Sequence, residues 1–522
     1  MSYIDGLASG LDTTSLVRQL MEAESAPKAR LEQRAEAEGH RLDAYASVRS
    51  KVASVRSAAN DLDSSSTWRT LTAESSDPDA VSVSAGTGEP GGELSFTVER
   101  LASSMSTTSA DTFTGPDDDL DGRTITITDP EGNAHDFDSA TTLGELVTQI
   151  NDAGIGVTAS TLQVSSGEHQ LVLSADETGA ANAFAVSESG WTDAFTVTRD
   201  AADAELDVGG VTVTRSTNTI DDLIEGATVT LHDETTSEVT VGVERDVVGI
   251  RERISSLVEA VNGALGEIDT LTDYDSENDE RSVLTGDPTV RTVAQRLTSA
   301  LTDAVGQSEL ESPGLVGVEM QRDGTVTFDE AAFDAAYESD PDAVERLFVD
   351  GAETTGDLDY VRAGWRAQPG TYDVDVTDEG DGTYSATIDG EPAEVGVNDD
   401  GSLRVRMAST HERLGGLEVE VAPGQTGAVG SVAYEPGSAK RLTTAANRAL
   451  DAVNGDLTTA ERARENRIKD FDRQIEAWEV RLDKREEGLR RQYTAMESML
   501  SQLQNQSQWL SGQLAGLQGN AQ

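Results

Sequence analysis

Residues 471–514 read FDRQIEAWEVRLDKREEGLRRQYTAMESMLSQLQNQSQWLSGQL, and this stretch decides the fold. Apolar side chains recur in and around it at intervals of three and four residues, which places them on one face of an α-helix. The sequence therefore predicts a long C-terminal helix with a coiled-coil seam that needs partner helices. The seam consists of Ile468, Phe471, Ile475, Trp478, Leu482, Leu489, Tyr493, Met496, Leu500, Leu503, Leu510, Leu514 and Leu517.

A second apolar stripe lies near the other end of the chain. It consists of Leu31, Ala35, Leu42, Tyr45, Val48, Val52, Val55, Ala59 and Leu62. Ahead of it, Leu7 and Leu11 alternate with glycines, each of which weakens a helix by about 1 kcal/mol relative to alanine. Pro27 is expected to break or begin a helix because proline cannot donate a backbone hydrogen bond. The inner halves of both stripes fit an intramolecular bundle, whereas the outermost turns are expected to pack between subunits.

Charge is distributed unevenly along the 522 residues. Residues 1–60 hold eight basic and eight acidic residues, and residues 461–522 hold ten of each, so the middle of the chain carries the whole net charge of −57. Such an acidic chain lacks the basic face that binding to nucleic-acid phosphates requires. Because lysine is rare beside so many carboxylates, we also hypothesise adaptation to a salty medium, where repulsion is screened.

The sequence between the two ends reads mainly as strands. Residues 80–85 and 93–98 alternate with period two on either side of the glycine-rich segment GTGEPGG, which predicts a hairpin. That segment matches G-x-G-x-x-G, but a strand follows it where a dinucleotide-binding fold needs a helix, so no cofactor is expected. Residues 317–328 predict a second hairpin that turns at Asp323-Gly324, and an acidic helix should follow it.

Residues 122–184 have a pattern of their own. Two strands precede a helix whose start has capping-box spacing at Thr142 and Glu145, and Gly154 can end this helix in a left-handed conformation. Two further strands follow, so the sequence predicts a ββαββ unit. Additional helical stripes lie at residues 247–271 and 290–301, and short strands fill residues 356–436.

Several stretches resemble one known family. GRTITITDPEGNAHDFDSATTLGELVTQINDAGIGVTASTLQ, from residue 122, resembles the insertion motif of flagellins and flagellar hook-associated proteins. IDGLASGLDTTSLVRQLMEAESAP, from residue 4, AELDVGGVTVTRSTNTIDDLIEGATVTL, from residue 204, and the C-terminal stretch resemble the flagellar filament cap family, FliD or hook-associated protein 2. The resemblance extends over nearly the whole chain.

The resemblance implies an α+β multidomain fold. Terminal helices should form a coiled-coil or helical-bundle stem that carries nested β-rich outer domains, including the flagellin-type insertion motif. The expected segments are a flexible terminal leg (1–40 with 481–522), a helical stem (41–68 with 246–310 and 437–480), β-rich plate domains (69–103 with 206–245 and 311–436) and an outer domain (104–205, motif at 122–184).

For function, the resemblance implies a role in assembly. Family members form a ring-like homo-oligomer, such as a pentamer, at the distal tip of the flagellum and place exported flagellin beneath it. The implied partners are other copies of the chain, flagellin, hook-filament junction proteins and a cytoplasmic export chaperone that binds the C-terminal helix. The implied location is extracellular, after flagellar type III export. The chain opens without the basic segment and apolar run of a cleaved secretory signal, which agrees with that route, and it has no apolar run long enough to insert into a membrane.

Catalysis has little support in the sequence. The five histidines are scattered, cysteine is absent, and the acidic segment at residues 273–280 departs from a calcium-binding loop, so neither an enzyme nor a metal site is expected. Two alternatives stay open. One is an adhesin that binds glycans, for which Trp191 and Trp365 are the aromatic candidates, and the other is a different flagellar axial protein, either a flagellin or a hook-filament junction protein.

Overall fold

The computed structural model describes residues 12–519 except 193–194, 276–277, 279, 306–309 and 311, and for 514–519 it describes the backbone alone. The chain divides into two compact units. Unit 1 combines Met1–Ser64 with Arg251–Gln522, and unit 2 is Ser65–Ile250. Both ends of the chain therefore belong to one unit, and unit 2 is inserted between two parts of it.

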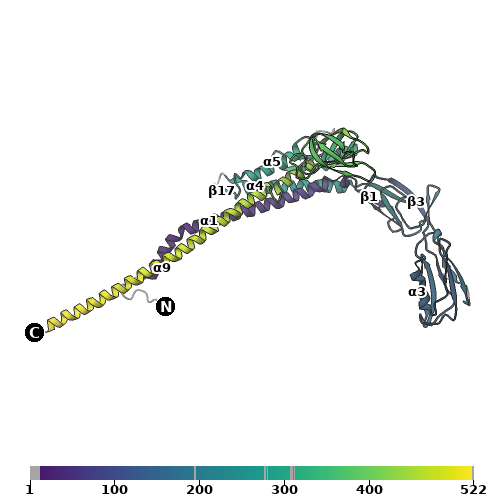
Figure 1. Cartoon of the computed structure of the whole chain (residues 1–522), viewed down its shortest axis with the longest axis horizontal. Helices are drawn as coiled ribbons and strands as arrows, with labels where there is room; N and C mark the ends of the chain where they lie inside the picture. The colour runs from purple at the N-terminus through teal and green to yellow at the C-terminus, as the bar shows by residue number, and fades with distance from the viewer. Residues whose placement is uncertain are drawn as a thin grey trace. The chain divides into compact units, whose positions relative to one another are not determined.

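Long helices dominate unit 1 (Figure 1). They are α1 (Thr13–Leu62), α4 (Val247–Thr272), α5 (Pro288–Thr302), α8 (Ser438–Leu450) and α9 (Asp456–Gly519). The inner half of the N-terminal stripe, from Tyr45 to Leu62, is fully buried where α1 packs against α8 and α9. The sequence pattern identified α1, α4, α5 and α9, because three-four spacing marks the face of a helix that must leave water, whereas no such stripe was read for α8.

Helix α1 contradicts one expectation, since it runs through Pro27 without a break. An interior proline costs about 3 kcal/mol in an isolated helix. Here α9 packs along α1 on both sides of the proline: Lys28 Nζ lies 2.7 Å from Glu479 and Arg485 Nε lies 3.0 Å from Glu24. Tertiary packing of this kind usually supplies most of the stability of a protein helix, and it offsets the lost hydrogen bond.

The second part of unit 1 is an eight-stranded antiparallel sheet in the order β20-β27-β22-β23-β24-β25-β26-β21. Its strands are β20 (Gly351–Gly356), β21 (Leu358–Arg362), β22 (Gly370–Asp378), β23 (Tyr384–Ile388), β24 (Glu391–Val397), β25 (Leu403–Arg406), β26 (Glu418–Val421) and β27 (Gly427–Glu435). Alternate residues such as Tyr372, Val374 and Val376 point into one apolar core. The short strands expected in this region are thus present, and they form a single sheet.

A small α/β segment precedes this sheet. The hairpin β18 (Val318–Met320) and β19 (Val326–Phe328) turns at Asp323-Gly324, as the sequence predicts, with Gly324 in the left-handed region. The single acidic helix expected after it is two helices, α6 (Glu330–Ser339) and α7 (Pro341–Phe348). Asp340 ends the first and caps the second, and Pro341 occupies the first position of α7, where a helix does not need its backbone N–H. A further two-residue ladder joins β16 (Tyr274–Asp275) and β17 (Glu280–Arg281).

A buried polar cluster joins the helices of unit 1 to its large sheet. Lys440 on α8 lies 3.2 Å from Asp63, at the end of α1, and 3.0 Å from Asp350, just ahead of β20. The Tyr360 hydroxyl donates a hydrogen bond of 2.8 Å to Asp350. Burial, opposed by Lys440 and reinforced by Asp350, raises the pKa of Asp63 to about 6. One cation therefore holds two carboxylates that come from distant parts of the sequence.

Unit 2 begins with the short helix α2 (Ser65–Trp68) and contains two sheets around one apolar core. Their orders are β1-β15-β3-β11-β12 and β13-β14-β2. The strands are β1 (Leu71–Ser75), β2 (Val81–Ala85), β3 (Gly92–Arg100), β11 (Ala204–Val208), β12 (Val211–Arg215), β13 (Thr219–Ile220), β14 (Ala227–Leu231) and β15 (Val239–Arg245). The prediction that residues 80–98 form a hairpin is wrong. Strands β2 and β3 do not pair with each other: β2 pairs with β14, and β3 pairs with β15 and β11. The long loop between β2 and β3 lets them enter different sheets, where each pairs with a strand distant in sequence.

The remainder of unit 2 is the region of the insertion motif. It contains β4 (Ser106–Thr108), β5 (Thr124–Thr128), β6 (Ala134–Phe137), α3 (Leu143–Ala153), β7 (Val157–Ser165), β8 (Glu168–Ala175), β9 (Ala185–Ser189) and β10 (Thr196–Arg199). The ββαββ prediction is confirmed, although its two strand pairs join different sheets, β6-β5-β9 and β10-β4-β8-β7. The Thr142 side chain caps α3, and Gly154 ends it in the left-handed conformation. Both sheets and α3 enclose one apolar core.

Candidate assembly surface

The surface that the sequence singled out lies on α1 and α9, which run antiparallel and side by side (Figure 1). Their direction follows from the ion pairs between them, which join Arg49 to Glu461, Lys28 to Glu479 and Glu24 to Arg485. As the residue number falls along α1, it rises along α9. The two ends of the sequence therefore form one helical pair.

The predicted seam of α9 faces this pair only in part. Its first five residues are half-buried: Ile468, Phe471, Ile475, Trp478 and Leu482. Leu489 is buried, with 8% of its surface exposed, and on α1 Val17 is buried near the start of the helix. Tyr45 is fully buried and Leu42 is half-buried. A pair of helices covers only one side of each seam, which accounts for the intermediate exposure.

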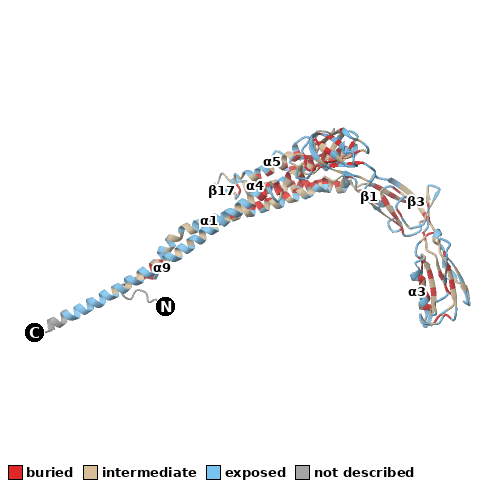
Figure 2. Cartoon of the chain, viewed as in Figure 1, coloured by how far each residue is buried: buried red, intermediate tan, exposed pale blue. Residues whose placement is uncertain are grey.

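Beyond Leu489 the seam becomes progressively exposed (Figure 2). Tyr493 and Leu500 are half-buried, whereas Leu503 is 57% exposed. Met496, Met499, Trp509 and Leu510 are exposed as well. Residues 496–510 thus present several large apolar side chains to solvent, and we call this segment the distal stripe. Large apolar side chains gathered in this way are typical of a surface that binds another protein.

Four of the predicted seam residues cannot be placed. Leu7 and Leu11 lie outside the described residues. Leu514 and Leu517 lie within α9, but their side chains are outside the description. Their assignment to the assembly surface remains a prediction.

A charged cluster lies between α1 and α9, beside the N-terminal end of α5. Glu38 on α1 is 7% exposed, and Arg41, Arg464 and Arg467 lie within 2.8, 3.0 and 3.5 Å of it. Burial by itself raises the pKa of Glu38, but the hydrogen bond from Arg464 and the charges of the three guanidinium groups lower it overall. The carboxylate is therefore held in its charged form. A buried charge with this many partners favours a single register between the helices.

The same cluster extends to α5. The Tyr45 hydroxyl donates a hydrogen bond of 2.5 Å to Asp287, the residue that caps α5, and Arg464 lies 3.6 Å from the same carboxylate. Burial, followed by the hydrogen bond with Asp287, raises the pKa of Tyr45. Three helices are thus fixed at one level of the stem.

Sequence reasoning missed this cluster, although a signal was present. Glu38 occupies the seam position between Ala35 and Leu42, and Arg464 occupies the position four residues before Ile468. An acidic residue that interrupts one apolar stripe and a basic residue that interrupts another predict an ion pair between the two helices.

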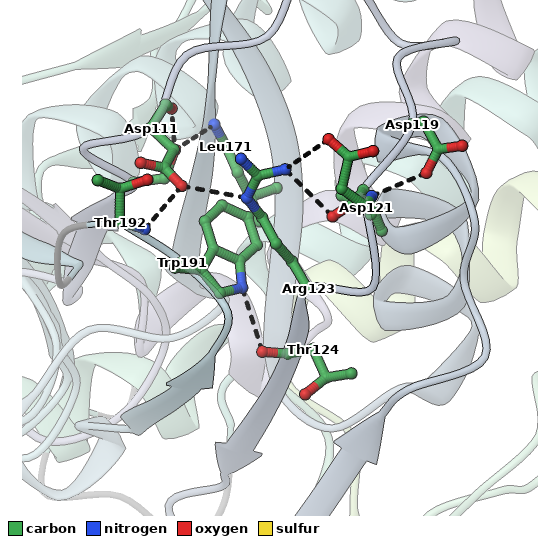
Figure 3. Close-up of polar contacts among 10 residues, drawn as sticks. Asp111, Asp119, Asp121, Arg123, Thr124, Leu171, Trp191 and Thr192 are labelled. Carbon is green, nitrogen blue, oxygen red and sulfur yellow. Dashed lines mark hydrogen bonds and ion pairs between the residues drawn. The ribbon is translucent and has the colours of Figure 1, made fainter.

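The aromatic candidates for glycan binding are engaged within their own domains. The Trp191 indole lies against Phe113 and Phe195, with ring centroids 5.7 and 5.1 Å away, and its N–H donates a hydrogen bond of 3.1 Å to the carbonyl oxygen of Thr124 (Figure 3). Trp365 carries the guanidinium of Arg366 on its face at 4.3 Å. Trp191 therefore belongs to the core of the insertion-motif region.

Next to Trp191, Figure 3 shows how Asp111 and Arg123 close the loops around this core. Arg123 Nε lies 3.2 Å from Asp111 Oδ2, which also accepts a hydrogen bond of 3.0 Å from the backbone N–H of Thr192. The same arginine donates a hydrogen bond to the carbonyl oxygen of Leu120. These contacts join three loops around the domain core.

Among residues 12–519, apart from the gaps given above, no three acidic or histidine side chains gather as metal ligands. None of the helices in the described ranges has an apolar stretch of the length that crossing a bilayer requires.

Family models match most of the chain. The model for the flagellar hook-associated protein 2 C-terminus matches residues 201–505, and the model for its N-terminus matches residues 9–105. The flagellin hook IN motif matches residues 124–177, which lie within the ββαββ region.

Individual sequence relatives carry the name hook-associated protein 2 as well. The lateral flagellar hook-associated protein 2 of Vibrio parahaemolyticus is 32% identical over 251 residues, which cover 45% of this chain and 55% of that protein. The flagellar hook-associated protein 2 of Escherichia coli K12 is 26% identical over 379 residues, covering 67% and 81%. The crystal structure of the D1-D2-D3 domains of the Escherichia coli flagellar cap protein has 26% identity and a TM-score of 0.48, and covers 59% of this chain and 90% of that one.

Proposed function

The chain belongs to the flagellar hook-associated protein 2 family and is a flagellar cap protein, and from this premise we propose how it acts. It oligomerises into a ring at the distal tip of the flagellum, where the ends of its helical stem contact flagellin and promote the addition of exported flagellin subunits. Its further partners are the hook-filament junction proteins and a cytoplasmic chaperone that binds α9 before flagellar type III export.

The distal stripe supports this proposal most directly. Residues 496–510 present methionine, leucine and tryptophan side chains to solvent on a helix that has passed the end of its pairing with α1. An amphipathic helix of this kind buries its apolar face only when a partner binds. The conformational entropy that the helix loses on binding offsets part of the favourable contact energy, so the contacts can form and break during assembly. This property suits a leg that must release one flagellin and engage the next.

The neutral charge of the stem ends supports the same role. Residues 461–522 carry ten basic and ten acidic residues, in a chain whose middle is strongly acidic. A surface without net charge can approach a partner that an acidic surface would repel. We therefore assign the contacts with flagellin to the stem and the solvated outer position to the β-rich domains.

The test is filament growth in cells whose cap gene encodes Leu500→Asp. A carboxylate in the seam should abolish filament growth, because its burial against a partner costs several kcal/mol. Ser501→Asp adds the same charge to an exposed position on the side of α9 opposite the distal stripe, and it should leave growth intact. Full-length filaments in the Leu500→Asp cells, with the protein present at normal amounts, would refute the leg role.

A further inference from the structure

The sheet β10-β4-β8-β7 has one face on the domain core and one face toward solvent. Strand register identifies the members of each face, because Thr107, Leu173 and Ala159 align across the sheet as buried positions. The solvent face, which we call the neutral face, consists of Ser106, Thr108, Thr158, Ser160, Leu162, Gln170, Val172, Ser174 and Thr196. These nine positions are uncharged, although 26% of the chain is charged. Two charged residues of opposite sign lie at the ends of the face, Arg199 opposite Ser106 and Glu168 at the start of β8.

The large sheet of unit 1 provides a comparison within the same chain. Its solvent-facing positions carry Asp373, Asp375, Glu394, Arg404 and Arg406 on neighbouring strands. Charges on exposed sheets keep proteins from pairing through them. Charged side chains therefore protect the large sheet of unit 1 from such pairing, whereas the nine uncharged positions of the neutral face provide no such protection.

Strand β7 adds an unprotected edge to the neutral face. It has nine residues, and it contains no charged residue, proline or glycine. The Asn151 side chain of α3 bonds both backbone groups of Ala159, with distances of 2.7 and 3.0 Å, and so occupies the edge at that level. Further along, the outward backbone groups of Thr161 and Gln163 have no hydrogen-bond partner among the described residues. Leu162 and Val164, between and beyond them, are about half exposed.

We propose that the neutral face and the free edge of β7 form a contact with a second copy of this chain. Two copies with a net charge of −57 each repel one another, so they associate most readily where neither surface carries a net negative charge. The free edge can add a strand from the second copy, because its backbone donors and acceptors at Thr161 and Gln163 are available. The proposal deepens the self-assembly part of the proposed function and rests on it.

Two exposed valines allow a matched test. Val164 lies at the edge of β7 with 47% of its surface exposed, and Val397 lies at the end of β24 with 60% exposed. Val164→Asp and Val397→Asp make the same chemical change and add the same charge. Light scattering of the purified full-length proteins should show oligomers for the wild type and Val397→Asp, and at least a tenfold weaker association for Val164→Asp.

A second pair controls for local damage to the strand. Ser160→Glu adds a charge at the neutral face, and Thr377→Glu adds one at an exposed position of the large sheet. Only Ser160→Glu should weaken association, with the thermal midpoint unchanged. Oligomers that survive both Val164→Asp and Ser160→Glu, or a wild type that is monomeric at molar salt, would overturn the proposal.

Filament growth separates this proposal from the proposed function. Cells with Val164→Asp should lose filament growth together with the oligomer. Lost growth with an intact oligomer would assign the neutral face to flagellin and reject the contact between copies. Failure of Leu500→Asp to affect growth would refute the leg role while leaving the oligomer measurement valid.

Discussion

At the residue scale, the features that fix the geometry of the stem are isolated charges within apolar surroundings. Glu38 and Arg464 interrupt two apolar stripes, and Lys440 holds two carboxylates at the junction with the large sheet. Each of these groups is costly to bury alone and acceptable only with its partners. They therefore favour one arrangement of the helices over the shifted registers that an apolar seam would also permit.

Glu38 gives the first prediction at this scale. Glu38→Ala removes the carboxylate that three guanidinium groups share, and it should lower the free energy of unfolding by about 2 kcal/mol, since the arginines are partly exposed. Urea unfolding followed by circular dichroism measures the change. Glu36→Ala, at an exposed position of the same helix, should change it by less than about 0.5 kcal/mol. Equal losses of unfolding free energy in both variants would show that the Glu38 cluster contributes no specific stabilisation.

Asp63 gives a prediction with a definite sign in pH. Its pKa is about 6 in the folded chain against an ordinary 3.8, so the folded state binds the proton more tightly than the unfolded state. The resulting stabilisation is complete below pH 3.8 and is lost as the pH rises through 6. Asp63→Asn removes this penalty, so the variant should gain up to about 3 kcal/mol over the wild type between pH 4 and pH 8.

The measurement for Asp63 is the difference in unfolding free energy between variant and wild type across that pH range. Asp43→Asn, at an exposed position of α1, serves as the control and should show a constant difference. A difference for Asp63→Asn that does not change with pH would contradict the assigned role of burial.

At the element scale, α9 changes its environment along its length. Its first half packs against α1, whereas Met496, Leu503 and Leu510 of its seam are exposed. A helix of 64 residues is about 95 Å long, so a single partner of 50 residues leaves part of it uncovered. The uncovered part is where intermolecular contacts are available.

Amide hydrogen exchange tests this description of α9. In the monomer, residues 497–513 should exchange much faster than residues 456–489, because an isolated helical turn opens easily without tertiary packing. Mass spectrometry of proteolytic fragments gives the exchange rate for each segment. If residues 497–513 of a sample shown to be monomeric were as strongly protected from amide exchange as residues 456–489, this description of α9 would be contradicted.

At the scale of the whole molecule, the charge of −57 dominates the behaviour in solution. Repulsion among so many carboxylates destabilises the compact state at low salt and is screened within about 3 Å at molar salt. The thermal midpoint should therefore rise by several degrees between low and molar sodium chloride. Calorimetry at both concentrations checks this, and an equal midpoint would end the hypothesis of adaptation to salt.

The sequence by itself determined the helices of the stem, the ββαββ unit, the hairpin at Asp323-Gly324 and the family. These features depend on local periodicity, turn residues and contiguous motifs, all of which are properties of neighbouring residues. The continuous helix through Pro27 was not predictable in this way, because the packing of α9 offsets a local penalty.

Only the tertiary structure decided the strand pairing and the polar clusters. Strand β2 pairs with β14 instead of β3, because strand partners are chosen by shared burial and not by nearness in sequence. The Lys440 cluster likewise joins residues 63, 350 and 440, which no local pattern relates. The exposure of the distal stripe also emerged only there, since a periodic pattern marks an apolar face but cannot say whether the chain itself covers it.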